Sequence, residues 1–311
     1  RSLAQEAKPP ERFADIPKDS VGLMSLDLGK VRASKDFQLW PWEILDVAAR
    51  EQFGVDLNDI EAIDGMVLMP SPEPEFGISI RTKRGYDIAK LPEQMFTPVQ
   101  SSPKDTSGVY RDVMEAPMIR VLQLEPTRVL VGTQGALRRM TSSRLKSGGD
   151  FVGLVQNSTA AMRLAVNLQA LRDVTSGFLL NPESGIPPQL TEDIQRILSL
   201  TDNALIEMHP DQQGFFQVSV GTGGTDKAKL VHQSMLRIRQ EIEKTVEQSF
   251  FSDIDQNTSI SPVMKQAMRS YVARLRDAFG NDDLVVENER VAMKVDRSLM
   301  STYSEIGRAH V

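Results

Sequence analysis

A glycine-rich segment, VSVGTGGTDKAKL at 218–230, has the layout of a phosphate-binding loop: a β-type run, a turn and a helix-forming run. A Walker A loop requires G-x-x-x-x-G-K-[ST], because its backbone N–H groups and hydroxyl contact the phosphates and magnesium. Counted from Gly221, Asp226 takes the place of the second glycine and Ala228 that of the hydroxyl. Asp226 also takes the third glycine position of the dinucleotide pattern G-x-G-x-x-G. Since a carboxylate repels a phosphate, the sequence predicts a turn in which Thr225 or Asp226 caps a helix.

The string DIDQNTS offers the best candidate for a metal site. Asp253, Asp255 and Asn257 occupy positions one, three and five of a calcium-binding loop, where side-chain oxygens converge on a hard cation. Thr258 stands at the position that requires glycine, and Met264 stands where the bidentate glutamate belongs. Half the ligand set is missing, so a polar loop between two helices is the favoured interpretation and calcium the weaker one.

Catalytic side chains form no recognisable set in the sequence. His209 and His232 fall on different predicted elements, and no H-E-x-x-H motif is present. The string nearest to a nucleophile elbow, GISIR, lacks the second glycine, and its Ser79 lies in the middle of a predicted strand. The absence of cysteine excludes thiol catalysis, disulfides and cysteine-based zinc sites. We therefore predict no catalytic residue and no cofactor, and we expect His209 to be an exposed loop histidine.

Both tryptophans of the chain lie in the string WPWE, at Trp40 and Trp42. Exposed tryptophans could bind a sugar or a protein partner. Packing is the favoured interpretation, because large aromatic side chains usually anchor cores. We expect Trp42 to point inward at the start of a helix and Trp40 to cover the preceding loop.

The chain contains an internal repeat. FGISIRTKRGYDIAKL at 76–91 aligns with FQVSVGTGGTDKAKL at 216–230. The apolar strand positions match, and so does the aspartate at the predicted helix start, Asp87 in the first copy and Asp226 in the second. The glycines of the second copy are mostly absent from the first. The shared feature is thus the predicted cap and not a phosphate cradle.

The spacing between the two copies changes along the chain. Pro70 and Pro210 are 140 positions apart, whereas the two aspartates at the helix start are 139 apart. Further on, LEPTRVLV resembles VENERVAM, and Arg128 and Arg290 in these strings are 162 apart. The second copy therefore carries 23 additional residues between these points. Matches in several separate blocks predict a duplicated unit.

Hydrophobic periodicity predicts the same elements in each unit. Alternating residues in MSLDL and LAVNL predict half-buried strands, and PWEILDVAAREQFG and PQLTEDIQRILSL predict helices. Later strands are predicted near 63–69, 76–82, 118–124 and 128–132, and near 203–209, 215–221, 283–287 and 290–295. Short connections between strands favour antiparallel pairing with helices on one face.

The additional residues of the second copy predict two amphipathic helices. Apolar residues recur at steps of three and four from Leu230 to Val246 and again from Met264 to Phe279. A helical hairpin packed on the second sheet is the favoured interpretation. A partner groove is the alternative that the methionine content permits.

We predict an α+β protein made of two tandem similar units of mostly antiparallel sheet. The expected divisions are a tail at 1–19, a first repeat at 20–145, a second repeat at 155–304 with a helical-hairpin insertion at about 232–279, and a tail at 305–311. The last string, EIGRAHV, resembles a translated sequencing adapter, as in a metagenomic fragment, and we expect it to be non-biological.

Composition limits the partners. The chain has 311 residues, 40% of them hydrophobic, and a net charge of −6, which together with the lack of a basic patch argues against nucleic-acid binding. No apolar run approaches the length of a membrane span. Ser2 and Ala4 are small at the two positions that a signal peptidase reads, so we expect an exported protein.

WPWEILDVAAREQFGVDLNDIEAI and GISIRTKRGYDIAKL resemble families of uncharacterised exported bacterial proteins built from a duplicated unit. The resemblance implies an exported protein and identifies no catalytic residues. We expect a non-catalytic binding or scaffold protein with a protein or glycan partner, bound in the cleft between the repeats or on the helical insertion. The alternative is a motif-free enzyme of the hydrolase class, with its site in the cleft between the repeats. A pocket with clustered Asp, Glu, Arg or His would favour that alternative.

Overall fold

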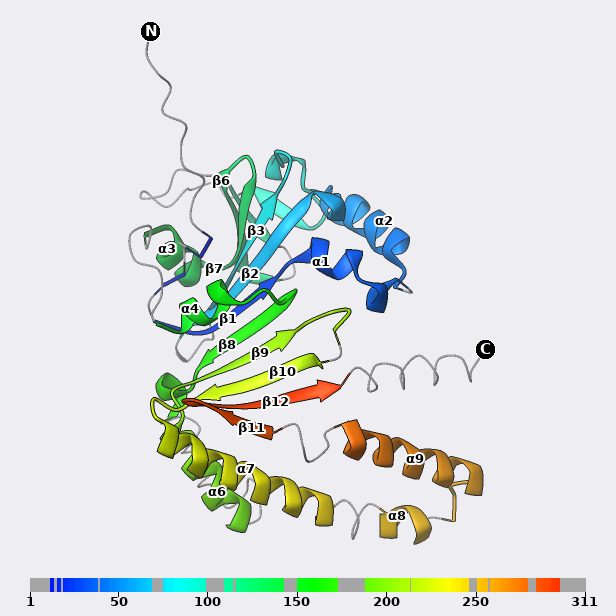
Figure 1. Cartoon of the computed structure of the whole chain (residues 1–311). Coiled ribbons are helices and arrows are strands. Elements are labelled where there is room, and N and C mark those ends of the chain that lie inside the picture. The colour runs from blue at the N-terminus through cyan, green and yellow to red at the C-terminus, as the bar shows by residue number, and fades with distance from the viewer. Residues whose placement is uncertain are drawn as a thin grey trace. The chain divides into compact units, whose positions relative to one another are not determined.

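A computed structural model (Figure 1) describes residues 12–13, 16–17, 19–38, 40–68, 75–98, 109–113, 116–142, 150–172, 188–212, 214–245, 251–256, 258–278 and 284–296. The chain divides into two compact units, Arg1–Ala165 and Val166–Val311. Both units are of mixed α+β type, and every strand pair with a described register is antiparallel. The predicted α+β class with antiparallel sheet is therefore confirmed.

The sheet of the first unit has the strand order β1-β2-β3-β7-β6-β5-β4. Its strands are β1 (Ser20–Leu26), β2 (Ile60–Leu68), β3 (Phe76–Thr82), β4 (Phe96–Pro98), β5 (Val109–Val113), β6 (Ala116–Glu125) and β7 (Arg128–Thr133). Its α-helices are α1 (Leu28–Ala33), α2 (Trp42–Phe53), α3 (Gln134–Ser142) and α4 (Asp150–Asn157), and its 3₁₀ turns are η1 (Lys35–Phe37), η2 (Leu57–Asp59) and η3 (Ile88–Lys90).

Helix α2 ends where the sequence predicts it. Gly54 follows the last helical residue with a φ of 64°, and its N–H group donates to the carbonyl groups of Ala49 and Arg50. The left-handed conformation suits glycine, which has no Cβ to clash with the backbone. The glycine thereby satisfies the carbonyl groups that the end of the helix leaves free.

The first unit departs from the prediction after β3. Asp87 does cap a helical segment, since its carboxylate accepts a hydrogen bond of 2.9 Å from the Ala89 N–H group, but that segment is only the single turn η3. Pro92 explains the short length, because a residue before proline avoids the helical region, and Leu91 is extended with a ψ of 138°. The structure also contains β4, β5, α3 and α4, which the sequence analysis did not anticipate.

Helix α3 covers one face of the first sheet at β3, β6 and β7. It buries Ala136, Leu137 and Met140. Gly77 and Gly132 lie opposite one another on β3 and β7, and a Cβ at Gly77 would lie only 2.5 Å from the Met140 sulfur. Gly77 therefore lets the helix approach β3, and Gly132, whose Cβ would meet the backbone of Phe76 and Gly77, lets β7 approach β3.

A second core lies on the opposite face of β6 and β7. It joins Val121 and Val129 to side chains of η3 and its flanks, Ile88, Leu91 and Phe96. Since successive strand residues point to opposite faces, these valines alternate with Leu122 and Leu130 on the α3 side. The first unit thus has apolar cores on both faces of its sheet.

The second unit has the strand order β9-β10-β12-β11. Its strands are β9 (Asn203–Met208), β10 (Gly214–Gly221), β11 (Leu284–Glu287) and β12 (Arg290–Asp296), and β8 (Met162–Asn167) crosses the division between the units. Its helices are α6 (Pro188–Leu200), α7 (Thr225–Thr245), α8 (Phe251–Gln256) and α9 (Pro262–Ala278). Helix α8 occupies part of the segment expected to be a loop. Among the described residues, no helix is both long and apolar enough to cross a bilayer.

The core of the second unit lies under α6 and α7, which run side by side (Figure 1). Ala228 and Val231 of α7 pack on Val220, Leu284 and Val291 of the strands. Of the apolar residues recognised in the sequence, Val231 and Met235 face this core, whereas Leu230 and Ile242 are about half exposed. Helix α7 starts five residues earlier than the Leu230 to Val246 pattern.

Candidate functional site

The glycine-rich turn at 221–224 leads directly into α7. The Ala228 N–H group donates to the Gly224 carbonyl at 3.0 Å, so Gly224 holds the position before the first helical turn. Asp226 lies inside the helix, its side chain is 98% exposed, and its carboxylate lies 3.5 Å from Lys229 Nζ. The predicted cap by Asp226 is therefore wrong. Only a side chain at the position of Gly224 reaches the free N–H groups in the usual way, and glycine has none.

A cavity of about 450 Å³ lies beside this turn. Three carboxylates, Asp202, Glu287 and Glu289, line it, together with one guanidinium, that of Arg290. The Thr222 hydroxyl lies 3.0 Å from the Glu289 carbonyl oxygen and so ties the turn to the β11–β12 hairpin. Since like charges repel, the lining disfavours a phosphate. This agrees with the prediction that the turn is not a phosphate cradle.

Arg290 is held by the strands on either side of it. Its Nη2 donates to Ser219 Oγ at 2.9 Å and its Nη1 to Asn203 Oδ1 at 3.4 Å. Burial lowers the pKa of the Arg290 guanidinium, and Glu207 opposes this change. The hydrogen bonds assign Arg290 to strand packing and not to capture of a ligand.

The calcium candidate is only partly within the described residues. Asn257 and the side chain of Asp253 lie outside them. The Asp255 carboxylate pairs with Arg269, and the Asp255 carbonyl accepts a hydrogen bond of 2.8 Å from Lys265 Nζ. Among the described side chains, no group of three or more potential ligands could hold a metal ion.

The structure does not bring the two histidines together. His209 Nε2 lies 3.8 Å from Glu207 Oε1 with only 14% of its side chain exposed, so the expectation of an exposed loop histidine is wrong. His232 Nε2 lies 3.1 Å from the Leu284 carbonyl oxygen. Ser79 is buried within β3, as expected. These side chains satisfy local packing and form no catalytic pair.

In the WPWE string, the two tryptophan rings stack on one another at the start of α2. Trp42 Nε1 donates to the Phe37 carbonyl at 2.9 Å, and the Arg32 guanidinium lies 4.9 Å from the centre of the Trp42 ring. Trp40 stacks on Trp42 with ring centres 5.6 Å apart and remains half exposed. Trp42 thus turns inward, in agreement with the packing interpretation, while Trp40 keeps an open face.

Helix α2 presents an apolar surface that the sequence analysis did not identify. None of its residues is buried. Trp40, Ile44 and Val47 are 50%, 69% and 52% exposed. Ile44 and Val47 are three residues apart and lie on one side of the helix, and Trp40 lies just before its first residue, Trp42. We call these three residues the α2 ridge. Their exposure could not be read from the periodicity, which shows an apolar side but not whether it is covered.

The charges around the α2 ridge are unequal. Arg32 is bound to Asp46 at 2.7 Å, and this guanidinium lowers the pKa of the Asp46 carboxyl. Arg50 is likewise bound to a carboxylate, that of Asp56 at 2.6 Å. Glu43 and Glu51 are exposed and form no ion pair with any described residue. The rim of the ridge is therefore acidic, because its cations are already paired.

Comparisons with known proteins bear on the fold alone. No family model matches the chain, and no curated protein is significantly similar to it. Among solved structures, crystal form I of TP0453 is similar at 10% identity over 97% of this chain and 99% of that one, with a TM-score of 0.43. Crystal forms III and IV of TP0453 are similar at 10% and 9% identity over 97% and 94% of this chain and 100% and 95% of those chains, with TM-scores of 0.48 and 0.47. Similarities of this size transfer no activity.

Proposed function

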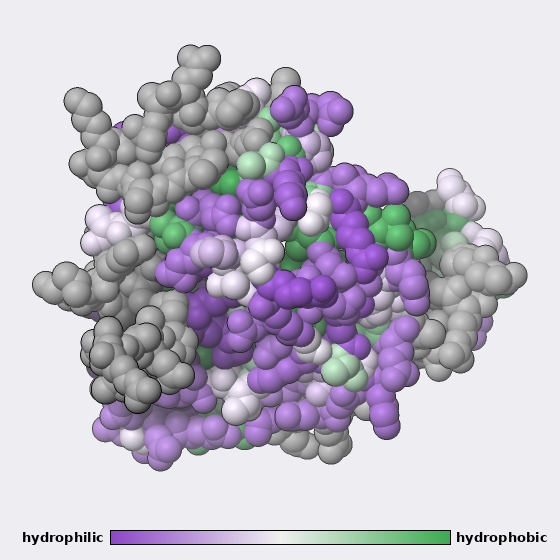
Figure 2. Space-filling model, turned by 90° about the horizontal axis from the view of Figure 1, so that it is seen from above, coloured by the Kyte–Doolittle hydropathy of each residue, from purple (hydrophilic) through white to green (hydrophobic). Residues whose placement is uncertain are grey.

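We propose that the chain is an exported, non-catalytic binding protein whose α2 ridge contacts a protein partner. The observation that supports this is the exposure of Ile44 and Val47 on a helix without a buried residue. Removing an aliphatic side chain of this size from water contributes about 1.5–3 kcal/mol. In Figure 2 hydrophilic residues dominate the visible face, and hydrophobic ones appear in separate patches. An apolar row of this kind is typical of an interaction surface.

The acidic rim specifies the chemistry of the partner. Glu43 and Glu51 flank the ridge without paired cations, and the whole chain carries a net charge of −6. A partner with an apolar centre and surrounding Lys or Arg would gain both burial and charge complementarity. A second copy of this chain or an anionic lipid surface would bring like charges together. We therefore infer a basic-rimmed protein surface as the occupant.

A displayed library of random peptides, selected on the purified chain, tests the proposal. The recovered peptides should combine apolar anchors with Lys or Arg and should lose binding to an Ile44→Asp, Val47→Asp double variant. Met118→Asp on β6 is the matched control, because Met118 is also 53% exposed but lies outside α2. Both variants should keep the parent free energy of unfolding within about 0.5 kcal/mol per site, since the altered side chains are exposed.

Two results would count against this assignment. Peptides that bind the double variant as tightly as the parent chain would place the binding surface elsewhere. Binding to an array of glycans that is lost on Trp40→Ala, without any peptide binding, would replace the protein partner with a sugar stacked on the open face of Trp40.

A further inference from the structure

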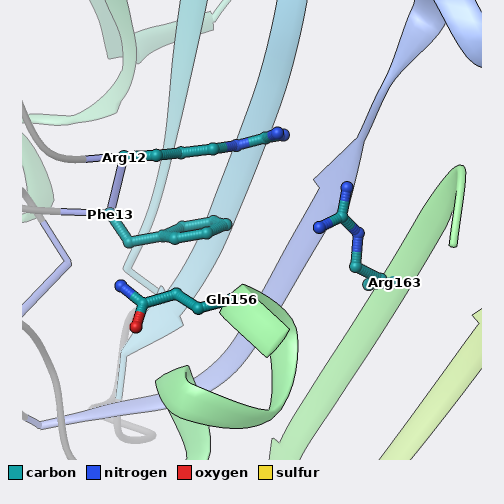
Figure 3. A pocket seen from close by; sticks show the side chains of 4 residues that line it. All are labelled: Arg12, Phe13, Gln156 and Arg163. Atoms are coloured by element: carbon teal, nitrogen blue, oxygen red, sulfur yellow. The ribbon is translucent and has the colours of Figure 1, made fainter. Parts of the chain in front are cut away.

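We propose a second binding site, a pocket in the first unit that takes a small organic carboxylate between the guanidinium groups of Arg12 and Arg163. The cavity has a volume of about 460 Å³ and is lined by Arg12, Phe13, Gln156 and Arg163. Pockets for small ligands have volumes of about 300–1,000 Å³ and a few convergent polar groups. Figure 3 shows the guanidinium ends of the two arginines facing one another across the opening. This site is separate from the α2 ridge.

The Nε and Nη2 atoms of the Arg12 guanidinium are fixed by hydrogen bonds to Asp64 and Ser25. Its Nε lies 3.2 Å from Asp64 Oδ2, and its Nη2 lies 2.9 Å from Asp64 Oδ1 and 2.8 Å from Ser25 Oγ. Asp64 and Ser25 are both buried on adjacent strands. The remaining nitrogen, Nη1, makes no hydrogen bond to any described residue, so this end of the fork can donate to a ligand.

Phe13 is the apolar residue of the lining and is almost completely covered. Its ring lies 5.2 Å from the Arg12 guanidinium and is layered beneath it in Figure 3. Phe13 is 3% exposed and has a φ of 73°, a backbone conformation that a side chain of this size rarely adopts. Such strain persists only where the surroundings impose it, and it occurs preferentially at ligand sites.

Arg163 reaches the pocket from β8. Its Nη1 donates to the carbonyl groups of Val155 and Ser158, both at 3.1 Å, at the end of α4. These bonds fix the orientation of the guanidinium while the residue stays buried. The adjacent Gln156 on α4 is exposed and adds an amide to the lining. The polar groups of the pocket thus come from three separate segments whose positions are set by hydrogen bonds.

The lining favours a small monocarboxylate over a phosphate. Guanidinium groups bind either anion through their planar donors. Asp64 lies beside Arg12 and lowers the positive charge of the site, which penalises a dianion more than a monoanion. Phe13 is almost completely covered, so it shapes the pocket without offering its ring to a ligand. We therefore assign the pocket to small monocarboxylates.

Calorimetric titration of the full chain with phenylacetate, its neutral amide and inorganic phosphate tests the assignment. Phenylacetate should bind, and the amide and phosphate should bind at least about tenfold more weakly, because the amide carries no charge and phosphate carries up to two. Gln156→Glu places a carboxylate in the lining and should weaken phenylacetate binding by about tenfold or more. Asn157→Asp makes the same charge change at the next residue, which is exposed and outside the lining, and should alter the affinity by less than about twofold.

These variants avoid the buried pair, since removing Arg12 would leave Asp64 without its partner and could unfold the unit. Absence of phenylacetate binding at millimolar concentration would overturn the proposal. So would equal binding by parent and Gln156→Glu, or tighter binding of phosphate than of phenylacetate. None of these outcomes bears on the α2 ridge, whose test uses peptides.

Discussion

At the scale of single residues, two aspartates that align in the internal repeat differ in structure, because only one of them caps a helical segment. The Asp87 carboxylate accepts from the Ala89 N–H group, whereas the Asp226 carboxylate points into solvent near Lys229. We expect Asp87→Ala to lower the free energy of unfolding by about 1 kcal/mol, as loss of a cap does. Asp226→Ala should change it by less than about 0.5 kcal/mol. Urea denaturation of both variants measures the difference, and equal effects would contradict the two local geometries.

Residues of the proposed carboxylate pocket show why the sequence does not display such a site. Arg12 and Asp64 are 52 positions apart, and Arg163 lies a further 99 positions along the chain. Each residue alone is a common polar side chain without a motif. Their proximity depends on the pairing of β1 with β2 and on the hydrogen bonds from Arg163 to the end of α4. Local sequence patterns predict neither the strand pairing nor these hydrogen bonds.

At the scale of elements, the close approach of β7 to β3 depends on Gly132. A Cβ at this position would lie 2.8 Å from Gly77 Cα and would also clash with the Phe76 carbonyl oxygen, and both neighbours are backbone. We expect Gly132→Ala to lower the free energy of unfolding by about 1–3 kcal/mol, as overpacking does. Gly153→Ala on α4 is the control, because a Cβ there meets nothing within 4 Å.

The control should raise stability by about 0.5–1 kcal/mol, since alanine is a better helix former than glycine. Thermal and urea unfolding of the two variants measure both the expected loss and the expected gain in the free energy of unfolding. A neutral Gly132→Ala would show that β3 and β7 can separate without cost.

The contact between α6 and α7 should depend on acid pH. Arg237 Nε donates to Asp193 Oδ2 at 3.0 Å, and this pairing, with a smaller contribution from Ser234, lowers the pKa of the Asp193 carboxyl. A carboxyl whose folded pKa is depressed stabilises the fold above its unfolded pKa, near about 3.9, and loses that contribution as pH falls through the lower folded value. We expect the stability difference between the parent and Asp193→Asn to be constant above about pH 5 and to shrink below about pH 4.

Urea denaturation between about pH 3 and pH 7 measures this difference. Ser199→Ala on the same helix is the control, because the Ser199 hydroxyl bonds only to the Arg196 carbonyl and does not titrate in this range. A difference between the parent and Asp193→Asn that does not change with pH would mean that the ion pair contributes nothing to the contact.

The sequence predicted the long elements with a regular apolar pattern better than the short ones. Helices α2, α6, α7 and α9 have long apolar periods, strands β3 and β10 alternate, and β7 and β12 are short apolar runs after tight turns, so the prediction found them. The short strands β4 and β5 have little pattern of their own and depend on β6 for pairing. The α2 ridge was not identified, since periodicity does not show whether an apolar side is covered.

At the scale of the whole molecule, we propose that the two units arose by duplication of one α+β unit. The order β2-β3-β7-β6 in the first unit corresponds to β9-β10-β12-β11 in the second. Ser79 lies opposite Leu130, and Ser219 lies opposite Ala292, so these pairings reproduce the sequence offsets of 140 and 162. The strand before this serine strand, β2 in the first unit and β9 in the second, has a different offset.

On that strand Asp64 lies opposite Ser79, and Leu205 lies opposite Ser219, an offset of 141 where the sequence match at the prolines has 140. A change of one residue reverses the face of every side chain on a strand. The duplication proposal therefore includes a one-residue shift between β2 and β9. It explains why the second unit keeps α7 where the first has only the turn η3, since the 23 additional residues follow that point.

The net charge of −6 should act on the encounter with a basic partner more than on the bound complex. Long-range attraction raises association rates and is screened by salt, with a Debye length of about 10 Å at 0.1 M. For a basic peptide selected on the α2 ridge, we expect the association rate to fall about tenfold between about 0.05 and 0.5 M sodium chloride. The dissociation rate should change much less, because burial of Ile44 and Val47 is not screened. Surface plasmon resonance separates the two rates. A Glu43→Gln, Glu51→Gln variant should associate more slowly at low salt, whereas Ile44→Ala should mainly dissociate faster. A salt effect confined to dissociation would instead mean that ion pairs within the complex, and not the charge of the whole chain, hold the peptide.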